Sequence, residues 1–404
     1  MAMAEDRPLR VALIAGEPSG DVLGAGLMRA LRQLTDDRVV FSGVGGAQMV
    51  EEGLASLFPV ADLAVMGLVE VFPRIRLLLR RIDETARLLQ ADPPDIAVTI
   101  DSPGFTRRVA QKLLVRSFPL LHYVAPTVWA WRPGRAKRLA KLYDHLLALL
   151  PFEPPYFQAV NLPTTFVGHP AVETLAKARQ AEEVSAREGR GFRHRHQIPP
   201  ERLLLAVLPG SRRGEVSRLL PIFTEVLRQL KSSGLDLHLL IPTVETVADT
   251  VRAAAASLPF PATILGTAAE RYGAMIAADA ALAASGTATL ELGLAGTPTI
   301  LAYKVHPLTA AIVRRLIRTP YAGLVNILQR REIMPEFVQE RCRADFILPA
   351  MHQLLTDPLA RQTQKDGCAA VAAQLGGDEE EPPSMRAAKV VLALAAKRLP
   401  SRET

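Results

Sequence analysis

Residues around position 100 combine a carboxylate with the features of a strand end. Asp101 directly follows the apolar run 96–100 and precedes Ser102, Pro103 and Gly104. Such a run is typical of a buried parallel strand, and α/β enzymes place their chemistry at the carboxyl ends of these strands. Asp101 is therefore a candidate general base. The same residues also suit an Asx-turn or a helix N-cap, which would give Asp101 a purely structural role.

Two Gly-rich turns, about half a chain apart, each close an apolar run and open a helical pattern. The first covers 16–21 after the run 11–15, and the second covers 209–212 after the run 203–208. A strand, a tight turn and a helix start form half of a βαβ unit, so finding them twice predicts two open α/β domains facing across a ligand-binding crevice. Four polar residues at other strand or turn ends compete with Asp101 for the proton: Glu17, Asp21, His122 and His169.

The second half of the chain holds a helix start that suits an anion. Ser285, Gly286 and Thr287 follow the apolar run 280–283, and small residues let a phosphate approach the free backbone N–H groups. Glu291 lies one turn further on, where it can accept hydrogen bonds from ribose hydroxyls. The alternative is an ordinary capped helix, with Ser285 or Thr287 as N-cap and Glu291 as capping-box partner.

The turn at 209–212 adds a cation to a second helix start. Arg212, beside Ser211, can hold a diphosphate with its guanidinium fork, although exposed arginines on a capped helix give the same pattern. Two such starts in one half of the chain predict a bound nucleotide diphosphate. The turns lack the P-loop and dinucleotide spacings, so neither ATP-driven phosphoryl transfer nor hydride transfer is expected. No Asp-x-Asp triplet occurs, so we expect no metal and no other cofactor.

Alternating apolar runs and helical patterns predict the domain organisation. We expect an N-terminal Rossmann-like domain at 1–175, a charged linker at 176–202, a C-terminal Rossmann-like domain at 203–350 and a helical segment at 351–404. Further strands are expected at 39–44, 120–124, 146–150, 165–167, 237–241, 262–265 and 299–302. The last helix is amphipathic and must pack on another surface, either the N-terminal domain or a second subunit, as in a homodimer.

Composition excludes several classes of protein. The chain has 404 residues and is 49% hydrophobic, and its two cysteines are too few for a disulfide framework and fit a reducing compartment. No signal-peptide pattern and no apolar stretch as long as a spanning helix occurs, so we expect a cytoplasmic protein. The net charge of +7 attracts anions, while an aromatic content of 5% disfavours stacking on single-stranded nucleic acid.

One stretch, 63–82, has the composition of a membrane contact. Apolar residues are followed by clustered arginines, as an interfacial contact requires, although a buried loop and helix would give the same pattern. The residues predicted to meet lipid or an acylated acceptor are Val65, Met66, Leu68, Val69, Phe72, Arg74 and Arg76. A second basic run can add to the same face: Arg132, Arg135, Lys137, Arg138 and Lys141.

Several motifs together resemble the lipid-A-disaccharide synthase family. They lie in order along the chain and include AGEPSGD at 15–21, HYVAPTVWAWR at 122–132, LPGSR at 208–212 and VNIL at 325–328. The resemblance implies the GT-B architecture, in which two parallel-sheet domains face across a cleft and C-terminal helices cross between domains or subunits. It further implies an inverting, metal-independent glycosyltransferase of lipid A and lipopolysaccharide biosynthesis, peripherally bound at the cytoplasmic face of a Gram-negative inner membrane.

The same resemblance implies the substrates and the residues that handle them. The donor is UDP-2,3-diacylglucosamine, the acceptor is the 6-hydroxyl of 2,3-diacylglucosamine 1-phosphate (lipid X), and the products are the disaccharide 1-phosphate and UDP. Asp101 matches the family's essential carboxylate, and Glu17 is the second catalytic candidate. The implied donor-site residues are Ser211, Arg212, Ser285, Gly286, Thr287, Glu291 and Asn326.

One departure and two rival functions accompany the resemblance. Many relatives have an acidic residue where this chain has Gly104, so Asp101 lacks that neighbouring carboxylate. Another UDP-sugar enzyme of the same architecture, such as a UDP-N-acetylglucosamine 2-epimerase or a different hexosaminyltransferase, is the first rival, and an epimerase needs no lipid surface. A two-lobed solute-binding protein is the second, and it predicts a secretory signal that the N-terminus does not show.

Overall fold

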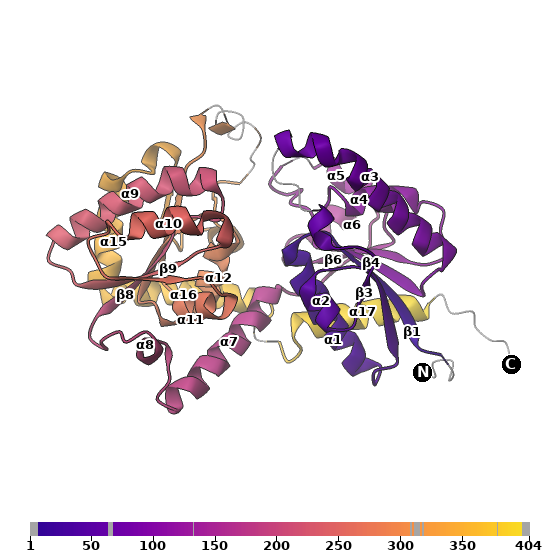
Figure 1. The fold of residues 1–404 in the computed structure, drawn as a ribbon, viewed down its shortest axis with the longest axis horizontal. Helices are drawn as coiled ribbons and strands as arrows, with labels where there is room; N and C mark the ends of the chain where they lie inside the picture. The colour runs from indigo at the N-terminus through magenta and orange to yellow at the C-terminus, as the bar shows by residue number, and fades with distance from the viewer. Residues whose placement is uncertain are drawn as a thin grey trace. The chain divides into compact units, whose positions relative to one another are not determined.

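The computed structural model describes residues 7–63, 68–131, 133–307, 309–310, 316, 319–377 and 379–397, with only the backbone described for 68–74. Its internal contacts divide the chain into two compact units (Figure 1). The first unit consists of Met1–Pro170 and Glu379–Thr404, and the second of Ala171–Asp378.

The first unit is built on a parallel sheet of seven strands in the order β3-β2-β1-β4-β5-β6-β7. The strands are β1 (Leu9–Ala15), β2 (Val39–Val44), β3 (Ala55–Ser56), β4 (Ile96–Ile100), β5 (Leu120–Tyr123), β6 (His145–Ala148) and β7 (Thr164–Phe166). The strand order reverses between β1 and β4, which is the topological switch point where open α/β sheets bind their ligands.

The second unit repeats this topology in a sheet of six parallel strands, ordered β10-β9-β8-β11-β12-β13. The strands are β8 (Leu203–Leu208), β9 (Leu237–Pro242), β10 (Ala262–Leu265), β11 (Ala280–Ala284), β12 (Thr299–Tyr303) and β13 (Glu336–Val338). Its switch point lies between β8 and β11. Each predicted Gly-rich turn therefore leaves the first strand of its sheet directly at a switch point.

Helices cover both faces of each sheet. The first unit holds α1 (Pro18–Leu34), α2 (Ala47–Glu51), α3 (Leu68–Ala91), α4 (Thr106–Lys112), α5 (Arg135–Leu139), α6 (Pro154–Gln158) and α17 (Pro383–Ala396). The second holds α7 (Pro170–Arg187), α8 (Phe192–Arg195), α9 (Arg213–Ser232), α10 (Ala248–Ala255), α11 (Ala268–Ala277), α12 (Thr287–Ala295), α14 (Leu324–Gln329), α15 (Ala344–Thr356) and α16 (Pro358–Gln374). Short 3-10 turns occur at η1 (Val60–Leu63), η2 (Glu245–Val247) and η3 (Gln339–Arg341).

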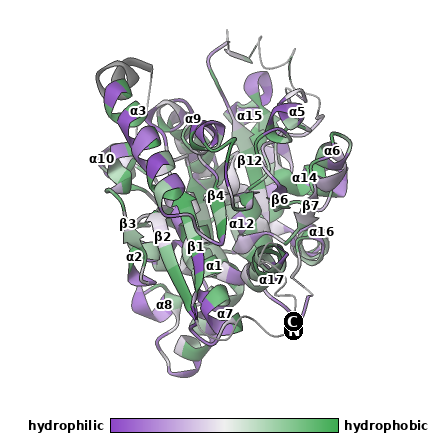
Figure 2. Ribbon diagram, turned by 90° about the vertical axis from the view of Figure 1, so that its right-hand side faces the viewer, coloured by the Kyte–Doolittle hydropathy of each residue, from purple (hydrophilic) through white to green (hydrophobic). Residues whose placement is uncertain are grey.

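Strand β1 illustrates why the apolar runs become central strands. Val11 and Leu13 pack on the side of α1 and α17, whereas Ala12 and Ile14 pack on the side of α3 and α4. Successive side chains of a strand point to opposite faces, so a strand covered on both sides must be apolar throughout. Figure 2 shows this contrast, with hydrophobic central strands and helices such as α3 that alternate in hydropathy.

The predicted strands are all present, and the parallel α/β class is confirmed. The sequence did not indicate β3 and β13, which have two and three residues and carry too little pattern to detect. Residues 176–202 include most of α7 and all of α8, so this predicted linker is largely helical. The last helix, α17, packs beside α1 in the first unit (Figure 1).

Candidate active site

The carboxyl edge of the first sheet brings Asp101 beside the first Gly-rich turn. Ala15 pairs with Ile100 across β1 and β4, so Gly16 and Asp101 follow at neighbouring positions. The Ser19 hydroxyl donates to Asp101 Oδ2 at 3.1 Å, and the Thr106 hydroxyl donates to the Asp101 carbonyl at 2.8 Å. Ser19 thus orients the partly exposed carboxylate, and Thr106 holds the backbone of the same residue. Sequence reasoning missed Ser19, although its place in the turn beside the strand end was a usable signal.

The backbone around Asp101 is held in an uncommon conformation. Asp101 and Ser102 have φ angles of 48° and 46°, in the left-handed region that non-glycine residues seldom adopt. Gly16 packs so closely on this loop that an added Cβ would lie 2.5 Å from Ser102 Oγ. Strain of this kind persists only where the surroundings impose it, and it is concentrated at functional sites.

Asp21, a competing carboxylate, has a structural task. It is 6% exposed and accepts hydrogen bonds from the backbone N–H groups of Gly46 at 2.8 Å, Gln48 at 3.0 Å and Met49 at 3.0 Å. These contacts tie α1 to the start of α2. A carboxylate so fully engaged is poorly placed to accept a substrate proton.

The other three candidates for accepting the proton differ in how far they are buried. Glu17 is exposed at the N-cap of α1, next to the turn that carries Ser19. His122 is 4% exposed, and burial lowers its pKa to about 4. Burial likewise lowers the pKa of His169 to about 4. Both imidazoles are therefore neutral and weakly basic at pH 7. The partly exposed Asp101 and the exposed Glu17 remain as the candidate carboxylates at this edge.

In the second unit, the turn after β8 places Ser211 and Arg212 at the start of α9. Gly210 has a φ angle of 117° and faces Glu215, whose Cβ would lie 2.8 Å from an added Cβ. Glu215 accepts from the backbone N–H groups of Ser211 at 3.3 Å and Arg212 at 3.4 Å, and pairs with Arg212 Nη1 at 3.0 Å. The donors predicted to bind a diphosphate are thus directed at a carboxylate of their own helix. A Glu three residues after the N-cap, which can accept from the first N–H groups of the helix, was the missed signal.

The start of α12 lies next to that turn, because β8 and β11 are neighbours with Leu208 paired to Ala283. Gly286 is the N-cap of α12 and no side-chain cap is formed. Ser285 instead donates to the carbonyl of Ala322 at 3.3 Å, and Thr287 is exposed. The alternative of a helix capped by Ser285 or Thr287 is wrong, and the first N–H groups of α12 have no side-chain cap among the described residues.

Glu291 is 9% exposed within α12 and belongs to a small polar cluster. The hydroxyl of Tyr272 donates to Glu291 Oε1 at 3.3 Å, and Arg271 Nη2 lies 3.5 Å from the same oxygen. Burial raises the pKa of Glu291, and Arg271 partly offsets this effect. The hydrogen bonds given by the described residues all go to Oε1, which leaves Oε2 as an acceptor for a hydroxyl ligand.

Asn326 is completely buried at α14, and its amide is fully used. Its amide nitrogen donates to the carbonyl of Met334 at 2.7 Å and to Glu336 at 2.8 Å, and its oxygen accepts from the N–H groups of Ile333 and Met334. Glu336 in turn accepts from the N–H of Gly323 at 2.9 Å. Asn326 therefore orders the loop on which the Ser285 hydroxyl rests.

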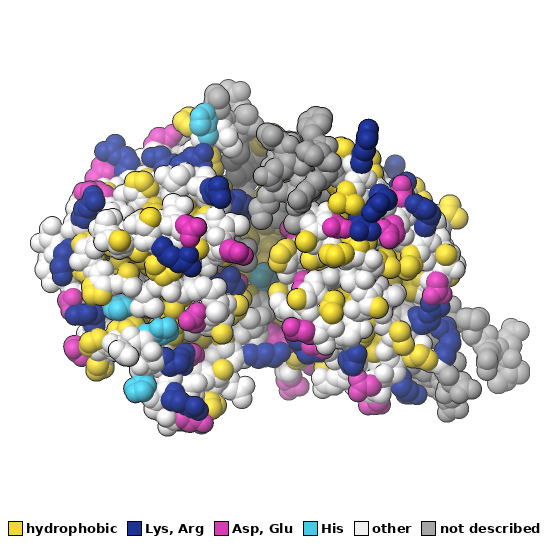
Figure 3. Space-filling view, in the orientation of Figure 1, with side chains coloured by type: hydrophobic (Ala, Val, Ile, Leu, Met, Phe, Trp, Pro, Cys, Tyr) yellow, Lys and Arg dark blue, Asp and Glu magenta, His cyan; other side chains and the backbone are white. Residues whose placement is uncertain are grey.

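The predicted lipid-contact segment is described only in part. Val65 and Met66 lie outside the described residues, and Leu68, Val69, Phe72 and Arg74 are described by the backbone of α3 alone. On the next turns Arg76 is exposed, and the apolar side chains of Ile75 and Leu79 are 40% and 48% exposed on one face. Figure 3 shows hydrophobic and basic side chains mixed over α3. None of the described helices is long and apolar enough to cross a bilayer.

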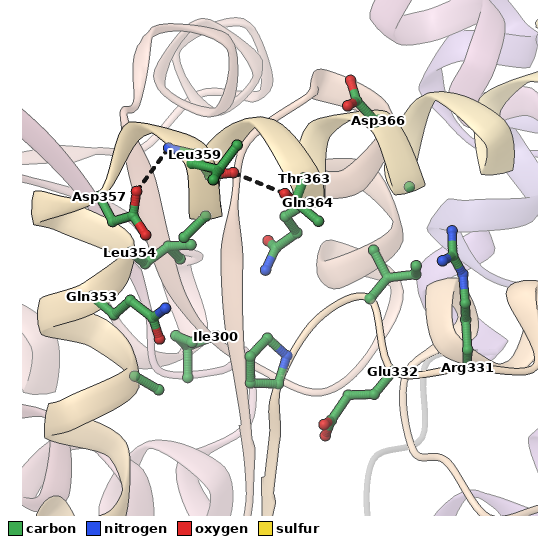
Figure 4. Close-up of a pocket in the computed structure, with 15 residues that line it drawn as sticks. Ile300, Arg331, Glu332, Gln353, Leu354, Asp357, Leu359, Thr363, Gln364 and Asp366 are labelled. Carbon is green, nitrogen blue, oxygen red and sulfur yellow. Dashed lines mark hydrogen bonds between the residues drawn. The ribbon is translucent and has the colours of Figure 1, made fainter.

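One cavity of the second unit lies away from the predicted donor site, and the described residues form no metal-binding cluster. Within the described part of the chain, no group of three or more His, Cys, Asp or Glu side chains is arranged to hold a metal ion. A cavity of about 630 Å³ in the second unit is lined by β12, α15 and α16 (Figure 4). Its residues Ile300 and Pro335 lie at the amino ends of β12 and β13, the sheet edge opposite the predicted donor site. In Figure 4 its polar groups Asp357 and Thr363 bond to the backbone of Leu359.

Two Rossmann-like units, each with a polar turn at its switch point, are the building blocks of the GT-B architecture. The structure is similar to that of a UDP-GlcNAc 2-epimerase from Neisseria meningitidis bound to UDP-GlcNAc, with a TM-score of 0.65 and 11% identity over 96% of this chain and 100% of that chain. It is also similar to Acinetobacter baumannii MurG, with a TM-score of 0.55 and 13% identity over 96% of this chain and 100% of that chain. These similarities confirm the GT-B fold.

The sequence comparisons narrow the class to one family. The family model described as lipid-A-disaccharide synthetase matches residues 11–390, and the chain belongs to that family. It is 52% identical to a lipid-A-disaccharide synthase of Rhodospirillum centenum over 97% of this chain and 96% of the relative. It is 46% identical to a lipid-A-disaccharide synthase of Paramagnetospirillum magneticum over 94% of this chain and 96% of that relative. The predicted family and the prediction of a glycosyltransferase of lipid A biosynthesis are confirmed.

Proposed function

We propose that this chain transfers 2,3-diacylglucosamine from UDP-2,3-diacylglucosamine to the 6-hydroxyl of 2,3-diacylglucosamine 1-phosphate. The observation that carries the proposal is the paired chemistry of the two switch points. One edge presents a carboxylate held by Ser19, and the other presents Arg212 with two helix starts. A base and an anion site are the two requirements for displacing UDP with a hydroxyl.

The reaction is a single in-line displacement with inversion. The acceptor oxygen forms the new bond to the anomeric carbon as the bond from that carbon to the UDP oxygen breaks. Asp101 accepts the hydroxyl proton, and Arg212 with the N–H groups of α9 and α12 stabilises the charge on the leaving UDP. Glu291 accepts a hydrogen bond from a ribose hydroxyl at its Oε2 atom, and Asn326 acts as a positioning residue through the loop at 322–323. In this scheme protein cations replace a metal at the diphosphate.

Replacement of Asp101 tests the assignment of the base. Asp101→Asn keeps the shape and tolerates the left-handed backbone, but it removes the proton acceptor. We expect kcat to fall by about 100-fold or more with KM little changed. Asp37→Asn is the matched control, because Asp37 is exposed and also left-handed, with a φ of 59°. Near-normal turnover by a folded Asp101→Asn variant would transfer the role to Glu17.

The exposed face of α3 supports a peripheral association with the inner face of the inner membrane. Ile75 and Leu79 are one helical turn apart, and the exposed Arg76 and Arg80 flank them. Apolar side chains beside arginines favour anionic bilayers. Vesicles containing anionic lipid should retain the wild type and lose an Ile75→Ser, Leu79→Ser double variant. Equal retention of both would remove this surface from the proposal.

A further inference from the structure

A cavity of about 310 Å³ lies in the first unit, next to the loop of Asp101. Pro103 and Gly104, two and three residues after Asp101, form one side of it. Helices α4 and α5 and the end of β5 form the rest. The volume is at the lower end of the range for small-molecule sites, so the cavity suits one polar group and part of a sugar.

The charged residues that line this cavity are all basic. Arg107 enters from α4, and Arg135 and Arg138 enter from α5, while none of the described lining residues is an Asp or Glu. Arg107 and Arg138 form no ion pair or hydrogen bond with the described residues, unlike Arg116 of the same unit, which pairs with Asp144 at 2.8 Å. Arg107 and Arg138 pair with no described carboxylate, and two such guanidinium groups at one cavity favour an anionic ligand.

One side of the cavity contains a buried hydroxyl without a well-formed hydrogen bond. Tyr143 is 5% exposed, and its hydroxyl lies near the hydroxyls of Thr99 and Thr106 but forms no hydrogen bond of normal geometry with any described residue. Buried phenols almost always find a partner, so this one requires an explanation. Its ring stacks on His122 with centroids 4.9 Å apart, and His122 Nδ1 is fixed by the Thr99 hydroxyl at 2.8 Å. The Tyr143 hydroxyl is therefore held rigidly at a site where a ligand oxygen can accept from it.

We propose that this cavity binds a phosphomonoester dianion, and that the dianion is the 1-phosphate of the acceptor sugar. The assignment to the acceptor rests on the proposed function, in which Asp101 accepts a proton from the 6-hydroxyl of that sugar. Pro103 and Gly104 of the loop after Asp101 line the cavity, and in this proposal one pyranose ring presents its hydroxyl to the carboxylate and its phosphate to the arginines. The UDP diphosphate is expected in the second unit and does not compete for this site.

Steady-state kinetics with two acceptors test the proposal. The acceptors are 2,3-diacylglucosamine with and without its 1-phosphate, presented in the same detergent. For the phosphorylated acceptor, Arg107→Gln and Arg138→Gln should each raise KM by about 10- to 100-fold, as expected for loss of a charge-assisted contact. For the dephosphorylated acceptor these variants should match the wild type. Arg108→Gln is the matched control, because Arg108 is the exposed neighbour on α4 and does not line the cavity.

Tyr143→Phe and a binding measurement keep the test informative if an arginine variant misfolds. Tyr143→Phe removes one oxygen only, and it should raise the same KM several-fold. Calorimetry with glucosamine 1-phosphate should detect binding to the wild type and to Arg108→Gln, with binding lost in Arg107→Gln. That binding result would support the phosphate site even if the wild type formed no disaccharide. Absence of the disaccharide would overturn the proposed function but not the phosphate site.

Two results would overturn the inference itself. The first is an Arg107→Gln, Arg138→Gln double variant that discriminates between the two acceptors as the wild type does. The second is a double variant with unchanged acceptor KM that binds phosphatidic acid vesicles more weakly than the wild type but binds phosphatidylcholine vesicles equally. In that case the arginines would contact a membrane phosphate and not the acceptor.

Discussion

Gly16→Ala is a small change with a specific expected consequence at Asp101. The new Cβ would lie 2.5 Å from Ser102 Oγ and 2.9 Å from Ser102 Cβ, whereas ordinary contacts are about 3.5–4.0 Å. The loop must therefore retreat by about 1 Å. Overpacking of this kind costs about 1–3 kcal/mol of unfolding free energy. A displacement of about 1 Å at a reacting group can lower kcat by about 100-fold.

A second substitution separates this steric effect from a general loss of stability. Ser102→Gly removes both clashing atoms, and glycine adopts the φ of 46° without strain. The double variant Gly16→Ala, Ser102→Gly should therefore recover most of the stability and kcat lost in Gly16→Ala. The coupling free energy between the two sites should be about 1–3 kcal/mol.

The wild type, the two single variants and the double variant form a double-mutant cycle. Urea titration gives the free energy of unfolding of each protein, and single-turnover kinetics give its rate. The reasoning is refuted if Gly16→Ala retains wild-type kcat and stability. It is also refuted if Ser102→Gly fails to restore the double variant, because the effect would then arise somewhere other than the contact with Ser102.

Three further predictions concern polar groups outside this contact. Asp21→Ala leaves three backbone N–H groups without their acceptor and should lower the free energy of unfolding by about 2–3 kcal/mol in urea titration; a smaller loss than for Asp21→Asn would contradict the account. Glu215→Gln removes the negative charge that occupies the hydrogen-bond donors at the start of α9, so the Kd for UDP in calorimetry should fall about threefold or more. A larger Kd would contradict the idea that the diphosphate displaces Glu215. Burial raises the pKa of Glu153, which is 2% exposed, to about 7. The folded state then holds this proton up to a higher pH than the unfolded state, so stability should fall by about 3 kcal/mol as pH rises from about 4.5 to 7; Glu153→Gln should remove this slope, and identical pH profiles would exclude it.

The sequence predicted the elements that position the site because their patterns are local. Runs such as 203–208 are apolar throughout, as a strand covered on both faces requires, and the residue after each run then lies at the sheet edge. The pattern alone therefore predicts that Asp101 and Arg212 lie just beyond the carboxyl ends of strands, which is where the structure has them. The fold therefore followed from hydrophobic pattern and turn chemistry.

The partners of these residues could not be predicted in the same way. Ser19 and Asp101 meet across 82 residues, and the cavity at Arg107 joins α4, α5 and β5, which only the sheet order brings together. In the sequence, Asp21 could not be distinguished from a catalytic carboxylate. The backbone N–H groups that bind it lie at the start of α2, 25 residues away, and no local pattern identifies them. Long-range hydrogen bonding thus decides which of several similar carboxylates is available for chemistry.

The central claim is that this chain forms the disaccharide using protein groups alone. The most direct measurement is incubation of the purified wild type with UDP-2,3-diacylglucosamine and 2,3-diacylglucosamine 1-phosphate in excess EDTA, with mass spectrometry of the lipid and nucleotide products. We expect equal amounts of the tetraacyl disaccharide 1-phosphate and UDP, at a rate unchanged by added Mg²⁺. Absence of the disaccharide, or its formation only when metal is restored, would contradict the account.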